Sequence, residues 1–87
     1  MPEATWRRSL TSIAAQLRER AALDSQAVSA LEQEGREETQ HGRDKTAAAN
    51  QDRATHLRKR ADTYREAARL LDDAEAMLAS LQDGRDE

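Results

Sequence analysis

The sequence predicts an all-α protein, a two-helix antiparallel hairpin with the character of a coiled coil. Three observations support this fold class. Ala, Glu, Lys, Leu and Arg make up 49 of the 87 residues, a composition typical of long helices. An apolar residue recurs at every seventh position in the C-terminal half, as in a coiled-coil seam. The chain has only one Ile and one Val, which is too little apolar β-branched material for a sheet.

Length, charge and composition narrow the remaining possibilities. The chain is short enough to form a single domain, residues 1–87. Its formal net charge of −3 is too small for repulsion to keep it unfolded. Because there is no cysteine, disulfides and cysteine-bound metals are excluded. We find neither a membrane-spanning stretch nor a secretory signal and expect a cytoplasmic protein, and the abundance of Arg and Ala indicates a bacterial source.

The first helix is expected to span about residues 3–34. Pro2 suits the first turn, where a missing N–H costs nothing. Apolar residues then follow at spacings of three and four, which places them on one helical face: Trp6, Leu10, Ile13, Leu17 and Ala21. Asp24 interrupts this face. Either the helix breaks at 23–24 and restarts, or it continues through these residues with a kink; we favour the kinked, continuous helix.

The polar segment 35–43 is the expected connector, because it has no apolar side chain and contains two glycines. Asp44 is then the expected N-cap of a long second helix, about 44–83, and Gly84 is its expected stop. The seam of this helix is formed by Leu57, Tyr64, Leu71 and Leu78, with Ala54, Ala61 and Ala68 three residues before the first three of them. Whether 36–53 is ordered without a partner stays open, because residues 50–53 offer little to pack.

A second apolar line runs beside this seam from Leu70 onward. It consists of Leu70, Ala74, Met77 and Leu81, at spacings of four, three and four. Together the two lines make a face too wide for one neighbouring helix. We therefore expect the hairpin to complete a helical bundle, either by dimerisation or with another protein.

Charge predicts the register of the hairpin. Residues 1–34 carry a net charge of −1 and residues 66–87 a net charge of −5. If the chain turns near residue 39, the numbers of facing residues add up to about 78. Arg7 and Arg8 then lie close to the acidic pair at positions 72 and 73. Exposed ion pairs contribute little energy, so they select the register and do not drive folding.

We predict a non-enzymatic protein–protein interaction module that needs no cofactor: an adaptor, co-chaperone or assembly factor for a helical partner. Whether that partner is a second copy or another protein is left open. In its shape and apolar C-terminal helix, the chain resembles the small hairpin co-chaperones of bacterial secretion systems, which implies binding to a helical protein. The expected binding surface comprises Trp6, Leu10, Ile13, Leu17, Leu57, Tyr64, Leu70, Leu71, Met77, Leu78 and Leu81.

The alternative function is nucleic-acid binding through a basic patch in a four-helix dimer. The patch consists of Arg53, Arg58, Lys59, Arg60 and Arg65, with only Asp62 among them. Such residues could contact phosphates or, equally, an acidic protein segment. The negative net charge and the single nearby aromatic residue count against nucleic acid.

A metal-dependent, ferritin-like protein is the third candidate. Glu38 and His41 match the Glu-x-x-His spacing that places a carboxylate and an imidazole on one helical face. They lie between two glycines in the polar connector, however, where an inward-facing site has no support. No grouping of residues suggests nucleophilic catalysis and no phosphate-binding loop is present, so we expect neither an enzyme nor a bound metal.

Overall fold

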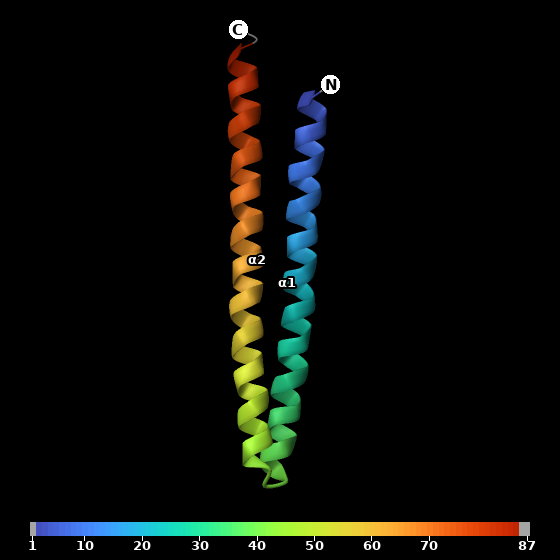
Figure 1. The fold of residues 1–87 in the computed structure, drawn as a ribbon, viewed down its shortest axis with the longest axis vertical. Coiled ribbons are helices and arrows are strands. Elements are labelled where there is room, and N and C mark those ends of the chain that lie inside the picture. Colours follow the sequence, from blue (N-terminus) through green and yellow to red (C-terminus); the bar gives the residue numbers. More distant parts are fainter. Residues whose placement is uncertain (1, 86–87) are drawn as a thin grey trace.

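The computed structural model describes the backbone of residues 2–85 and the side chains of residues 5–82. Helix α1 (Pro2–Gln40) and helix α2 (Asp44–Arg85) run side by side in opposite directions and form one elongated hairpin (Figure 1). The Cα atoms extend over 69 × 16 × 12 Å. Residues 2–85 contain no strand. The predicted all-α hairpin is therefore confirmed.

Helix α1 is longer than the sequence predicted. It continues without interruption through Asp24 and ends at Gln40, so residues 35–40 are helical and only residues 41–43 connect the two helices. The predicted connector 35–43 is wrong in its first six residues. Local hydrogen bonds explain the extra turns: the Thr39 hydroxyl donates to the carbonyl of Gly35 (3.0 Å), and the Gln33 amide donates to Glu37 (3.1 Å). Contact with α2 offsets the low helix propensity of glycine at position 35.

The end of α1 is set by Gly42. Its φ of +75° lies in the left-handed region, which glycine adopts without a steric penalty. The Gly42 N–H donates to the carbonyl of Thr39 (3.0 Å), and the Arg43 N–H donates to the carbonyl of Glu38 (2.8 Å). These two bonds form a Schellman motif, which satisfies carbonyls at the helix end. The Arg43 guanidinium also lies 3.2 Å from the Glu38 carboxylate, where an apolar contact usually closes this motif.

Both ends of α2 differ slightly from the expected positions. The Ala47 N–H donates to the carbonyl of Arg43 (3.0 Å), so Arg43 occupies the N-cap position and Asp44 is the first helical residue. Asp44 still lies favourably in the first turn, at the positive end of the helix dipole. At the other end α2 continues past Gly84 to Arg85, so the predicted stop is not where the helix ends.

Small side chains fill the space between the helices. On each helix the buried apolar residues are seven positions apart and at most 6% exposed: Ala14, Ala21 and Val28 on α1, and Ala54, Ala61 and Ala68 on α2. Gly35 continues the α1 series, and a Cβ built there would lie 4.0 Å from the carbonyl oxygen of Ala47, which continues the α2 series. Small residues at this spacing let two backbones approach closely. Among the described side chains, no apolar residue larger than Val is buried.

The observed register differs from the predicted one. The numbers of Arg7 and Glu75, which form an ion pair (3.8 Å), add up to 82, as do those of Gly35 and Ala47. The bend lies at 41–43 instead of near 39. Moving the bend by one residue towards the C-terminus raises the sum of two facing residue numbers by two. As a result Arg7 faces Glu75. The charge argument had placed it opposite Asp72 and Asp73 instead. The prediction placed the partner of Arg7 on the correct helix but about one turn away from its observed position.

Candidate protein-binding face

One side of the hairpin carries a ladder of polar contacts between the helices. Its α1 residues follow the buried small residues by four positions, and so do its α2 residues. Three rungs result: Arg18 donates to Asp72, Arg58 donates to Glu32, and Arg65 donates to the Ser25 hydroxyl (2.6 Å). We call these six residues the charged ladder. The side chains of its ion pairs are one-third or more exposed, so each pair contributes about 0–1 kcal/mol and serves mainly to fix the register.

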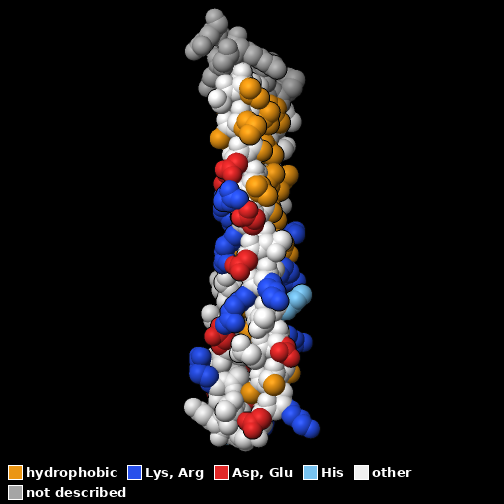
Figure 2. All heavy atoms as spheres, turned by 90° about the vertical axis from the view of Figure 1, so that its left-hand side faces the viewer, with side chains coloured by type: hydrophobic (Ala, Val, Ile, Leu, Met, Phe, Trp, Pro, Cys, Tyr) orange, Lys and Arg blue, Asp and Glu red, His pale blue; other side chains and the backbone are white. Residues whose placement is uncertain are grey.

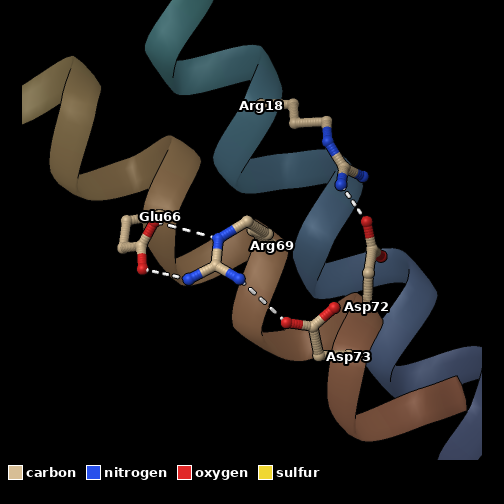
Figure 3. A network of polar contacts seen from close by, with 5 residues as sticks. All are labelled: Arg18, Glu66, Arg69, Asp72 and Asp73. Carbon is tan, nitrogen blue, oxygen red and sulfur yellow. Dashed lines mark hydrogen bonds and ion pairs between the residues drawn. The ribbon is translucent and has the colours of Figure 1, made fainter.

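A second polar network lies on α2 next to the first rung of the ladder (Figure 3). Arg69 donates to the Glu66 carboxylate (Nε to Oε2, 3.1 Å) and to Asp73 (Nη1 to Oδ2, 2.9 Å). These hydrogen bonds lower the pKa of Glu66 and raise that of Arg69. Asp73, which was expected opposite Arg7 and Arg8, is therefore held within its own helix. Asp72 is therefore bound by an arginine of α1, and Asp73 by an arginine of α2.

The opposite side of the hairpin carries large apolar side chains. On a helix, a residue three positions after a buried one and a residue four positions after it lie on opposite sides of that buried residue. The ladder residues lie four positions after the buried residues on both helices. The residues three positions after them therefore lie together on the other side of the hairpin. They hold Leu17 and Leu31 on α1 and Leu57, Tyr64 and Leu71 on α2, all half-buried. The same lines continue outward to half-buried Leu10 and to Leu78, which is 40% exposed.

This side is widened by the residues that directly precede the heptad positions of the buried small residues, which are 7 and 14 on α1 and 68, 75 and 82 on α2. Trp6 is half-buried, with the Arg7 guanidinium 5.4 Å from its ring centroid, while Ile13 is 45% exposed. On α2 the equivalent positions hold small Ala67 and Ala74, and then Leu81. The complete set, which we call the apolar face, is Trp6, Leu10, Ile13, Leu17, Leu31, Leu57, Tyr64, Ala67, Leu71, Ala74, Leu78 and Leu81.

The structure divides the predicted binding surface into two parts. Nine of its eleven residues lie on the apolar face. Leu70 and Met77 instead follow by two the heptad positions of the buried small residues, Ala68 and Glu75, so they project from the back of α2 and are 54% and 66% exposed. Figure 2, which looks onto α2, shows hydrophobic side chains along one edge of its C-terminal half and charged side chains along the other edge. The sequence prediction omitted Leu31, although its spacing of seven from residue 24 and fourteen from Leu17 marks it as a seam residue.

A paired acid lies in the middle of the apolar face. Asp24 is 7% exposed, and both of its oxygens accept hydrogen bonds from Arg60, from Nε and Nη2, each 2.8 Å long. These bonds hold the pKa of Asp24 below its ordinary value despite the desolvation of the carboxylate, and they raise the pKa of Arg60. The guanidinium also lies 6.0 Å from the centroid of the Tyr64 ring. This pairing explains how the helix can continue through Asp24, the alternative that the sequence analysis favoured over a break.

Pairing with α1 divides the predicted basic patch. Arg58 and Arg65 are rungs of the charged ladder and Arg60 holds Asp24, so three of its five cations contact α1. Arg53 and Lys59 are exposed on α2. The sequence suggested one continuous positive surface, because it showed neither the acidic partners nor the two sides to which these residues point.

Glu38 and His41, the pair weighed as a candidate metal site, differ in their surroundings. Glu38 is half-buried and salt-bridged to Arg43, while His41 is exposed in the bend. Within the described part of the chain, no three His, Cys, Asp or Glu side chains gather as a metal site. Neither helix, over the residues described, has the length and apolar character needed to cross a membrane.

Comparison with known proteins yields no matching family model and no significant match to a curated protein or a solved structure. The geometry of the two sides of the hairpin is therefore the basis for a functional proposal.

Proposed function

We propose that this protein is a non-enzymatic interaction module that binds helical partners through its apolar face. One observation carries the proposal: among the described side chains, the buried apolar residues are all small, and the large apolar ones remain at least partly exposed. Complete burial of one such side chain is worth about 1.5–3 kcal/mol. Much of that free energy is still unused in the isolated hairpin and is available for binding.

The arrangement of the two sides supports a directional module. The charged ladder makes one side well solvated, whereas the apolar face presents two parallel rows of large side chains. Two adjacent apolar rows on neighbouring helices form a surface onto which the apolar side of a further helix can pack. An adaptor, a co-chaperone or an assembly factor would each use such a face.

Site-specific photocrosslinking in the native host tests this proposal. A photoreactive amino acid replaces Leu17 or Leu71 on the apolar face and, as matched controls, Gln26 or Thr55 on the exposed outer sides. We expect protein adducts from the two face positions and none from the controls. Adducts from all four positions alike, or from none of them, would contradict a dedicated binding face.

Nucleic-acid binding has less support from the described residues. Arg58, Arg60 and Arg65 are already engaged by α1, and replacing them would disturb the hairpin itself. A clean test of this alternative therefore uses Arg53→Glu with Lys59→Glu. If the wild type shifts a nucleic-acid probe at low salt and this double variant does not, the exposed cations of α2 carry that function.

A further inference from the structure

We infer that the apolar face is covered by a second copy of this chain, in a four-helix bundle with both bends at the same end. This inference rests on the proposed function, because it names the partner of the same face. Three features of the described residues support it: the area of the face, the uneven distribution of its apolar side chains, and the fit between its two rows.

The area of the face matches a dimer interface. The face runs from Trp6 to Leu31 on α1 and from Leu57 to Leu81 on α2, about 37 Å at 1.5 Å per residue. Over the 16 Å width of the hairpin this is about 600 Å², the lower end of what each partner contributes to a stable interface. A single docked helix would contact the facing sides of the two rows but leave their outer edges exposed. A second hairpin is two helices wide and covers both rows. It also supplies an equally apolar surface, as expected for a homodimer interface.

The distribution of side chains fixes the direction. The most exposed large residues of the face, Ile13, Leu78 and Leu81, all lie in the half remote from the bend. Towards the bend, the two seam lines end in polar residues, Glu38 and Asn50. With the bends at opposite ends, a full-length overlap would set the apolar half of each copy against the polar end of the other. With the bends at the same end, apolar halves meet and the two-fold axis runs along the bundle.

This arrangement also brings large residues opposite small ones. When the two-fold axis runs along the bundle, α1 of one copy lies over α2 of the other. The positions that directly precede the heptad positions of the buried small residues hold Trp6 and Ile13 on α1 but Ala67 and Ala74 on α2. In the observed register, Ile13 is level with the stretch between the two alanines. Bulky side chains facing small ones interdigitate across such a contact.

The ion pair of Asp24 and Arg60 is compatible with this interface. Each pair is satisfied within its own copy, so burying it leaves no unpaired carboxylate. In the symmetric arrangement the two pairs come level with each other.

Molecular mass by light scattering, over micromolar to millimolar concentrations, tests the identity of the partner. The wild type is expected to be a dimer. Ile13→Glu should weaken dimerisation at least tenfold, whereas Leu23→Glu, at an exposed leucine of α1 outside the face, should leave it unchanged. Both side chains are substantially exposed, so neither substitution removes a buried group; equal circular dichroism spectra of the monomers check this.

Distance measurement between spin labels tests the direction. The chain has no cysteine, so His41→Cys gives a single labelling site in the bend. Neighbouring bundle helices lie about 10 Å apart, so two bends at the same end should place the labels about 20–40 Å apart. Bends at opposite ends would separate them by roughly the 69 Å length of the hairpin.

Four outcomes of these two experiments would overturn the inference. A wild type that stays monomeric, a larger oligomer, equal effects of the two glutamate variants, or a label separation near the hairpin length would each do so. A monomer that still gives specific crosslinks from Leu17 and Leu71 to another protein would refute the second copy and leave the proposed function standing.

Discussion

At the residue scale, the ion pair of Asp24 and Arg60 is asymmetric. The carboxylate is 7% exposed, whereas about half of the Arg60 side chain reaches solvent. Removal of the arginine leaves a buried charge without a partner, but removal of the aspartate leaves a cation that water can solvate. The sequence identified both residues but gave them unrelated roles, because residues 36 positions apart show no relation until the register is known.

This asymmetry predicts unequal effects of two single substitutions. Arg60→Met should lower the urea midpoint of unfolding clearly, whereas Asp24→Leu should leave it unchanged or raise it by completing the apolar seam. Equilibrium urea denaturation followed by circular dichroism measures both. If the two variants lose the same stability, the carboxylate is not the buried partner.

The lowered pKa of Asp24 predicts a loss of stability in acid. A carboxyl group whose pKa is lower in the folded than in the unfolded state stabilises the fold above its unfolded value, here near 3.8, and this contribution disappears as the pH falls through the folded pKa. The wild type should therefore lose stability as the pH falls below about 5. Asp24→Leu should lose less over the same range, and the difference between the two isolates Asp24 from other acids such as Glu66. Parallel curves would contradict this assignment.

At the element scale, the two glycines near the bend have different roles although both suggested a break. Gly35 lies within α1, at the next seven-residue step after Val28, and touches α2. Gly42 lies outside the helix and takes a left-handed conformation. The heptad repeat predicted the two helices, but the connector was misplaced because the absence of apolar side chains was taken as the absence of a helix. The series Ala14, Ala21, Val28 was the signal that could have placed Gly35 correctly.

Alanine at each glycine should therefore act in opposite directions. Gly35→Ala should stabilise the hairpin by about 0.5–1 kcal/mol, because alanine favours a helix and its Cβ would make only an ordinary contact. Gly42→Ala should destabilise it by about 1–2 kcal/mol, because a Cβ is disfavoured at φ +75° even though space is open around it. Thermal unfolding of both variants measures the pair. A gain in stability for Gly42→Ala would show that the bend tolerates another conformation.

At the scale of the whole molecule, the hairpin separates its polar and apolar surfaces. The sequence predicted a surplus of apolar surface on α2, and most of the predicted binding residues do lie on one side. It could not predict that Leu70 and Met77 project from the back, nor that the basic patch is split. Both depend on how the helices are rotated against each other, which is set by the small buried residues and the charged ladder.

If a second copy completes the core, stability should depend on protein concentration. The melting temperature of the wild type should rise with concentration, because association favours the folded state by mass action. Leu71→Glu should melt at a lower temperature that does not change with concentration. Scanning calorimetry at several concentrations makes the comparison, with Leu23→Glu as the matched control. A wild-type melting temperature that is constant over this range would contradict the prediction.

The position of the bend has a practical consequence. Helix α1 begins and helix α2 ends at the same extremity of the hairpin, and the bend lies at the other extremity of a molecule 69 Å long (Figure 1). An affinity tag or fluorescent protein attached at either terminus would stand beside Trp6 and Leu78 and obstruct whatever docks there. A short epitope inserted between His41 and Arg43 would leave that extremity clear.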